Sequence, residues 1–152
     1  MLDSDLVAFV HGGVAVAVAT RSADHTPAFT RAWGPEVSGD GLTLRLCVDA
    51  PPESATRVNL EDNGAIAVGF NPLTIARGLQ IKGVASSVRE PAPEELERAE
   101  RHFLAFCLEG ERVGVSESQL RRAFAPQDCV SVTLSIAEVF DQTPGAGAGQ
   151  RV

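Results

Sequence analysis

Six stretches of the chain are predicted to be β-strands, and four of them place apolar side chains at every second position, the period that is typical of this structure. The clearest is Leu42-Thr43-Leu44-Arg45-Leu46-Cys47-Val48, which follows the turn-forming segment Ser38-Gly39-Asp40-Gly41. Residues 14–20 are apolar at both parities, as expected of a strand that is covered on both sides. The pattern predicts strands over residues 14–20, 27–37, 42–48, 65–71, 79–88 and 129–140.

Helical periodicity and capping residues predict four helices between these strands. The first is a short helix that Asp3 or Ser4 caps and that His11-Gly12-Gly13 ends, and two more cover residues 55–60 and 94–109. A last short helix begins at a capping box of residues 116–119 and ends at residue 124. The face of the longest helix that is expected to pack on the core carries Leu96, Ala99, Phe103, Phe106 and Cys107. Six strands in mostly antiparallel order with helices at the periphery predict a mainly β (α+β) fold, a small closed barrel.

The chain is expected to form one domain over residues 1–142. Residues 143–152 are rich in Gly and Ala and have few side chains able to pack, so they are predicted to be a flexible tail. The formal net charge of -7 opposes nonspecific attraction to nucleic acid or to an anionic membrane surface. No basic leader opens the sequence, and three irregularly spaced cysteines make no disulfide framework, so a soluble cytoplasmic protein is expected.

Three short motifs occur in the same order as the predicted elements. They are Arg31-Ala32-Trp33-Gly34, then Thr56-Arg57-Val58-Asn59-Leu60 with Asn63, and then Gln80-Ile81-Lys82-Gly83. Together they resemble motifs of the pyridoxamine 5'-phosphate oxidase-like family, the flavin-binding split barrels, over residues 6–142. The resemblance implies a six-stranded antiparallel split β-barrel that is a homodimer, binds FMN in two sites between its subunits, and acts as an oxidoreductase on a small molecule.

The resemblance also implies which residues hold the FMN. Arg57 and Lys82 are expected to bind the phosphate, with a hydroxyl contributed by Thr56 at the start of the same helix as Arg57. Gln80 lies two residues before Lys82 on the same strand face and is expected to meet a hydrogen-bonding edge of the flavin ring. Arg31 is assigned to the phosphate or the ribityl chain.

Each of these residues also has an ordinary structural interpretation. Alternation alone allows Gln80 and Lys82 to be the solvated side of a half-buried strand, and Arg57 to be a solvated charge on a surface helix. Trp33 is expected to be exposed and to serve as a packing or dimer-contact residue. No catalytic residue is assigned, because no spacing implies a Ser or Cys partner for any of the three histidines.

The chain also departs from the family pattern. Glu36 stands near a position that is often basic in the family, and Thr56 replaces one of an adjacent basic pair. Residues 141–152 lack the Arg and His substrate motif of true pyridoxamine phosphate oxidases, so vitamin B6 is not the expected substrate. Two alternatives stay open, a non-catalytic split barrel that binds flavin or haem, and a deazaflavin-dependent reductase, which would call for more basic residues in the groove.

Overall fold

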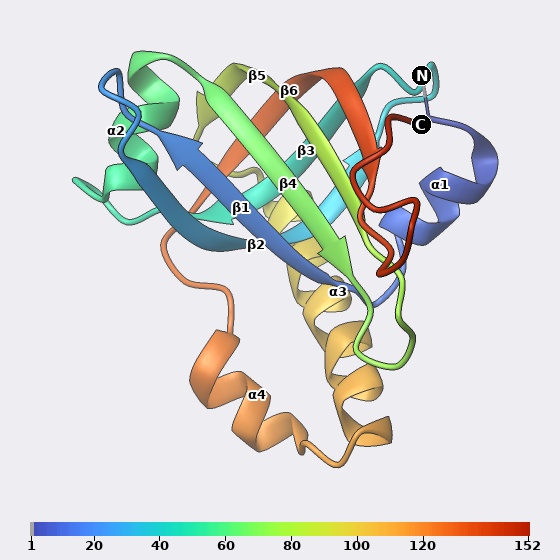
Figure 1. Cartoon of the computed structure of the whole chain (residues 1–152). Coiled ribbons are helices and arrows are strands. Elements are labelled where there is room, and N and C mark those ends of the chain that lie inside the picture. The colour runs from blue at the N-terminus through green and yellow to red at the C-terminus, as the bar shows by residue number, and fades with distance from the viewer. Residues whose placement is uncertain (1) are drawn as a thin grey trace.

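The alternating segments of the sequence form six strands that pair edge to edge until the sheet closes (Figure 1). The protein is described here by a computed structural model that covers residues 2–152. Its elements are, in chain order, α1 (Ser4–Val10), β1 (Ala15–Arg21), β2 (Pro27–Val37), β3 (Thr43–Asp49), α2 (Ala55–Asp62), β4 (Ala65–Asn71), β5 (Leu79–Arg89), α3 (Pro93–Arg112), α4 (Glu117–Phe124) and β6 (Cys129–Asp141).

The strand order around the barrel is β1-β2-β3-β6-β5-β4, and each neighbouring pair is antiparallel. β4 pairs with β1, so the first and fourth strands close the ring. Closure satisfies the backbone hydrogen bonds that edge strands would leave unpaired. The predicted six-stranded antiparallel barrel with peripheral helices is confirmed.

The interior of the barrel is filled by every second residue of the strands. Val16 and Val18 of β1 and Ile66, Val68 and Phe70 of β4 are all buried there. Removing each such side chain from water contributes about 1.5–3 kcal/mol toward folding. The predicted placement of Ile66, Val68 and Phe70 on one face of β4 is confirmed, and the alternate residues of both strands therefore point outward.

A second apolar cluster lies outside the barrel, where α3 packs across β2 and β3. Trp33 is only 1% exposed and packs edge-on against Phe103 and Phe106, with ring centroids 5.2 and 5.8 Å apart. Gly34 allows this approach, because its φ is +59° and a Cβ there would lie 2.8 Å from the backbone nitrogen of Ala99. The expectation of an exposed Trp33 is therefore wrong, since α3 covers it.

Four of the five residues predicted for the core face of α3 are buried, and one is not. Ala99, Phe103, Phe106 and Cys107 are buried as expected, but Leu96 is 47% exposed. Its neighbour Glu95 is only 2% exposed instead. The cause is tertiary: Glu95 receives hydrogen bonds from other elements, which fix the rotation of the first helical turn.

Two further features concern the surface. The outward residues of β1 are half-buried or exposed, so β1 is not covered on both sides within this chain, contrary to the expectation for residues 14–20.

Residues of the C-terminal segment form backbone hydrogen bonds with β6. The amide of Val152 donates to the carbonyl of Val139, and the amide of Gly149 donates to that of Asp141. Among the helices of residues 2–152, none combines the length and the apolar character needed to cross a membrane.

Candidate functional site

The outer surface of β1 and β4 is made of very small residues. Ala17 and Ala19 point outward from β1, opposite Gly69 and Ala67 of β4. We call these four residues the small-residue face. Figure 1 shows both strands on the near side of the barrel with no helix in front of them. A solvated strand face usually carries longer polar side chains, so a surface of Ala and Gly allows a flat partner to come close to the backbone.

The small-residue face forms the middle of two rows of paired residues that run across four strands. They are Arg31, Ala17, Gly69 and Gln80 in one row and Phe29, Ala19, Ala67 and Lys82 in the other. The rows thus place three of the predicted cofactor residues on one outer surface, with Gln80 and Lys82 on one side of the small residues and Arg31 on the other. Because neighbouring strands lie about 4.8 Å apart, the backbones of Arg31 and Gln80 are roughly 14 Å apart.

A hollow of about 370 Å³ lies at one end of the small-residue face. Lys82 and Arg21 both line it, together with Ala19 and Ala67. The sequence interpretation missed Arg21, because it ended the first strand at residue 20. The available signal was its parity, since Arg21 continues the outward series of Ala17 and Ala19.

The cations of this surface differ from most others in the chain. Ion pairs with carboxylates, within 4.0 Å, engage Arg45, Arg57, Arg89, Arg98, Arg101, Arg112, Arg121 and Arg151. Lys82 instead has its ammonium 4.7 Å from the centre of the Phe140 ring, and Arg21 donates to the carbonyl of Ser22. Within residues 2–152, neither Lys82, Arg21 nor Arg31 is in an ion pair with a carboxylate. Three positive charges in a chain of net charge -7 are thus free to meet an anion.

The other two predicted cofactor residues lie on α2 and are engaged differently. Ser54 caps this helix by accepting from the backbone amide of Arg57. The guanidinium of Arg57 is ion-paired with Glu61 and lies 3.8 Å from Glu90. Thr56 is 4% exposed and faces the protein, as do the neighbouring buried positions of α2. The structure therefore brings Lys82 together with Arg21 in one hollow, and it brings Arg57 to two carboxylates.

Arg31 borders a second depression between β2 and the segment that joins α4 to β6. Its guanidinium carbon lies 4.1 Å from the centre of the Phe124 ring, a cation–π contact. Asp49 lines the same depression and accepts hydrogen bonds from the indole of Trp33 and the thiol of Cys129. Burial raises the pKa of Asp49, although these two hydrogen bonds partly oppose the rise.

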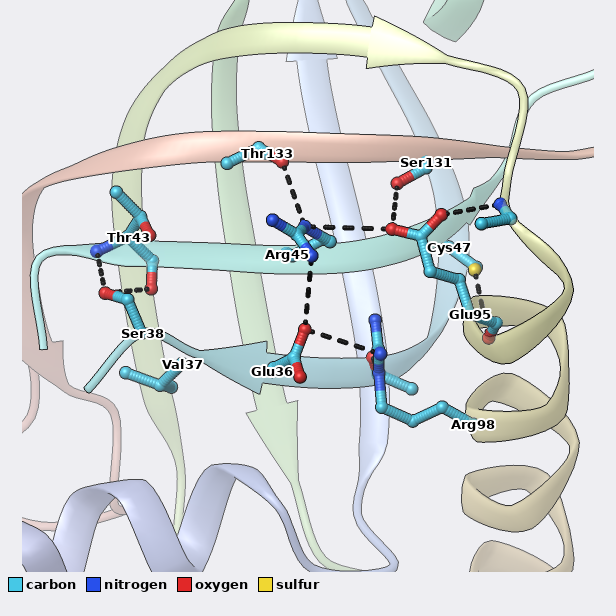
Figure 2. Close-up of polar contacts among 12 residues, drawn as sticks. Glu36, Val37, Ser38, Thr43, Arg45, Cys47, Glu95, Arg98, Ser131 and Thr133 are labelled. Carbon is cyan, nitrogen blue, oxygen red and sulfur yellow. Dashed lines mark hydrogen bonds and ion pairs between the residues drawn. The ribbon is translucent and has the colours of Figure 1, made fainter.

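Glu36, the residue noted as a departure from the family, is part of an ion network on the other side of the barrel (Figure 2). It lies 3.5 Å from Arg45 and 3.4 Å from Arg98. Arg45 in turn lies 3.7 Å from Glu95, which accepts two 2.8 Å hydrogen bonds from Arg89. Glu36 is thus held between two guanidinium groups, away from the small-residue face.

The cysteines show no reactive environment. Cys47 is buried, and burial raises the pKa of its thiol to about 11, so the nucleophilic thiolate is disfavoured. Burial and the neighbouring Asp49 raise the pKa of Cys129 further still. Among the described residues, no group of three or more His, Cys, Asp and Glu side chains is placed to hold a metal ion.

Comparison with known proteins gives matches among solved structures alone. No protein-family model matches the chain, and no curated protein does. HupZ of Group A Streptococcus superposes with a TM-score of 0.58 at 18% identity, over 98% of this chain and 100% of that chain. A candidate pyridoxamine 5'-phosphate oxidase from Lactobacillus delbrueckii gives 0.56 at 18% identity, over 91% of this chain and 93% of that one.

An FMN-binding protein from Syntrophomonas wolfei superposes with a TM-score of 0.54 at 11% identity, over 91% of this chain and 87% of that chain. Likenesses at such identities concern the arrangement of the backbone. They agree with the strand order and helix positions described above. The chain therefore has the split-barrel fold of pyridoxamine 5'-phosphate oxidase-like proteins, as its three motifs indicated.

Proposed function

We propose that the protein is a homodimeric flavoprotein that binds FMN on the small-residue face and acts as an oxidoreductase on a small molecule. The observation that carries the proposal is the position of this face between polar side chains that make no ion pair with a carboxylate among residues 2–152. Lys82, Gln80 and Arg21 border it on one side and at one end, and Arg31 borders it on the other. An isoalloxazine ring has flat apolar faces and polar edges, which suit small residues flanked by hydrogen-bonding groups.

The phosphate of FMN fits the hollow that Arg21 and Lys82 line. Among the described residues neither cation is in an ion pair with a carboxylate, so binding a dianion there breaks no such pair. Gln80 offers a donor and an acceptor to the ring edge, because its side chain points outward in the row next to Lys82. A bound flavin would supply hydride-accepting chemistry, and these residues would hold and orient it.

Arg57 and Thr56 remain predicted phosphate ligands, but both side chains would have to change their contacts to bind the phosphate. The guanidinium of Arg57 would have to exchange Glu61 and Glu90 for the phosphate. Thr56 would have to expose a hydroxyl that is now buried. The proposed phosphate site therefore rests on Lys82 and Arg21 first.

The same surface supports the proposed homodimer. Phe29 is 69% exposed at the border of the small-residue face, which leaves an aromatic ring in water next to a row of alanines. A second copy laid over this face would cover both and would enclose a flavin between the subunits. The mass of the protein in solution, measured by light scattering after size-exclusion chromatography, tests this: a monomer at all concentrations contradicts the dimer.

The cofactor is tested by titrating the purified protein with FMN and with riboflavin, which lacks the phosphate. Flavin fluorescence reports binding of both. We expect FMN to bind at least tenfold more tightly than riboflavin, because two charge-assisted contacts to phosphate contribute about 1.5–3 kcal/mol each. Equal affinity for the two compounds would contradict the proposed phosphate site, and the absence of binding of either compound would contradict a flavin cofactor.

Single substitutions locate the phosphate. Lys82→Ala and Arg21→Ala should each weaken FMN binding by roughly tenfold or more and leave riboflavin binding nearly unchanged. Arg122→Ala is the matched control, because Arg122 is an exposed cation of α4 and lies away from the hollow. If Arg57→Ala weakens FMN binding while Lys82→Ala does not, the phosphate lies at α2.

A deazaflavin cofactor is the second candidate, favoured by one observation. An F420 reductase superposes on this chain with a TM-score of 0.52 at 17% identity. The same titration with F420 separates the two cofactors. Catalysis is tested on the loaded protein, in which reduction by a nicotinamide donor and reoxidation by an added acceptor would support an oxidoreductase over a non-catalytic binding protein.

A further inference from the structure

Lys82 lies opposite a carboxylate in the sheet but forms no ion pair with it. Its partner in the pairing of β5 with β6 is Glu138. Residues directly opposite in an antiparallel pair have Cβ atoms about 4.5–5.5 Å apart, so these two long side chains can reach each other, and their opposite charges attract. The ammonium of Lys82 lies instead 4.7 Å from the centre of the Phe140 ring, and within residues 2–152 no ion pair joins it to a carboxylate.

The carboxylate of Glu138 is engaged by Arg151 of the C-terminal segment. Nη1 of Arg151 lies 3.6 Å from Oε1 of Glu138, and Nη2 donates a 3.1 Å hydrogen bond to the carbonyl of Ala137. Both charged side chains are partly exposed, so their ion pair is weak and either partner can exchange it for another. The carboxylate opposite Lys82 therefore has a different cation beside it.

Backbone pairing places Arg151 at this position. β3 pairs with β6 only as far as Ser135, which leaves that edge of β6 without a partner strand over its last residues. The C-terminal segment takes up this edge: Arg151 lies opposite Phe140 in an antiparallel bridge, and the amide of Val152 donates to the carbonyl of Val139. The contact between the guanidinium and the carboxylate is thus set by the fold of the segment.

We propose that Arg151 is a positioning residue for the phosphate site: by holding Glu138, it keeps the ammonium of Lys82 available to an anion. The inference rests on the proposed function, in which Lys82 binds the phosphate of FMN. Without Arg151, the carboxylate of Glu138 would turn to Lys82, and a phosphate would have to displace it. Arg151 needs no contact with the cofactor to have this effect.

The first test needs no flavin, because Lys82 is the only lysine of the chain and its side chain can be observed alone. In protein made with isotope-labelled lysine, nuclear magnetic resonance gives one set of side-chain signals, and the ring current of Phe140 should shift the ε-proton signal upfield. In Arg151→Gln we expect this signal to move to the position of an ordinary lysine, because the ammonium turns to Glu138. When Glu138→Gln is added to Arg151→Gln, the upfield shift should return. Phe140→Leu confirms the origin of the shift by removing it.

The second test measures the effect on the cofactor by titrating the same variants with FMN and with riboflavin. Arg151→Gln should weaken FMN binding about two- to fivefold, the range expected of an exposed ion pair, and leave riboflavin binding unchanged. In the Glu138→Gln background the same substitution should have no effect, because no carboxylate is left opposite Lys82. Arg122→Gln, which removes an exposed cation of α4, is the matched control for charge and should leave FMN binding unchanged.

Two results would overturn the proposal. An unchanged Lys82 signal in Arg151→Gln would mean that Glu138 does not turn to the ammonium. An equal loss of FMN affinity with and without Glu138 would mean that Arg151 acts on the phosphate through its own charge. If the wild-type protein binds no FMN, the proposed function fails, and the Lys82 signal alone decides whether Arg151 keeps the ammonium apart from Glu138.

Discussion

Glu95 holds the start of α3 onto the barrel, and its replacement by Gln tests that role. The carboxylate accepts two hydrogen bonds from Arg89, one from Ser131 of β6 and one from the backbone amide of Ala92 at the helix start. Glu95→Gln keeps the size of the side chain and removes its charge. The variant therefore measures what the charge contributes and leaves the packing in place.

The magnitude can be derived in two ways. Burial by itself raises the pKa of Glu95, but the hydrogen bonds from Arg89, Ala92 and Ser131 outweigh it and hold the pKa at about 2, compared with an ordinary value of 4.5. A difference of this size corresponds to roughly 3 kcal/mol between the charged and neutral forms in the folded state. Removal of one partner from a buried ion pair costs about 3–5 kcal/mol, and partial exposure of Arg89 places this case at the lower end.

Urea denaturation at pH 7, followed by the fluorescence of Trp33, gives the free energy of unfolding directly, since Trp33 is the sole tryptophan and is buried. We expect Glu95→Gln to lose about 3 kcal/mol. The control is Glu97→Gln, which removes an exposed carboxylate of the same helix and should change the free energy of unfolding by less than about 0.5 kcal/mol.

The pH dependence gives the same test a second readout. The folded-state pKa of Glu95 is lowered, so its stabilisation is present above pH 4.5 and is lost as the pH falls toward 2. The difference in unfolding free energy between wild type and Glu95→Gln should therefore shrink over this window. A variant within about 0.5 kcal/mol of wild type at pH 7, or a difference that stays constant down to pH 3, would refute the reasoning.

Two further predictions concern stability. The folded-state pKa of His102 is lowered to about 4 from 6.5, so the unfolded chain takes up a proton on this residue at a higher pH than the folded protein does. Between pH 6.5 and 4 the free energy of unfolding of the wild type should therefore fall by on the order of 3 kcal/mol more than that of His102→Phe. Urea denaturation across this pH range measures the difference. Gly83→Ala should destabilise the barrel by about 1–3 kcal/mol, because a Cβ there would lie 2.0 Å from the carbonyl oxygen of Ser135; Gly39→Ala, whose Cβ would meet nothing within 4 Å, is the control in thermal denaturation. Equal effects of the two glycine substitutions would show that β5 can shift at its bulge.

The strands could be predicted from the sequence because their signal is local. Inward and outward positions alternate along each strand whatever its neighbours are, so the outward direction of Gln80 and Lys82 followed from parity alone. The capping pattern at Ser116 likewise predicted the start of α4 from adjacent residues. The three-motif resemblance gave the correct fold for the same reason, since each motif lies within one element.

The errors at Trp33 and Leu96 depend on contacts between elements distant in sequence. Trp33 was expected to be exposed, but it lies on the side of β2 that α3 covers, some 70 positions later in the chain. Leu96 satisfies the apolar periodicity of α3, yet Glu95 is buried in its place, because Arg89 and Ser131 hold the carboxylate from β5 and β6. No pattern within the helix specifies these partners.

Arg21 shows the same limit at the candidate site. Its neighbour in the hollow, Lys82, lies on a strand that reaches β1 only through β4, so their proximity depends on the closure of the barrel. In the sequence, Arg21 reads as the first residue of a polar turn. A phosphate site made by Arg21 and Lys82 therefore becomes visible only once the strand order is known.

The small-residue face is the strongest indication that the outer surface of this barrel binds a ligand or a second subunit. Ala and Gly are unfavourable in strands, and Gly69 in particular weakens β4, so these residues lower the intrinsic stability of the sheet. The rest of the barrel follows the expected pattern, with β-branched and Leu side chains inside. A surface whose residues lower the stability of an otherwise consistent fold is typical of a functional site. Ala67→Leu, which would fill this surface, is expected to raise the free energy of unfolding and to abolish FMN binding, because the small residues would then be present for the flavin and not for stability. If the variant still binds FMN, the cofactor does not lie on this face.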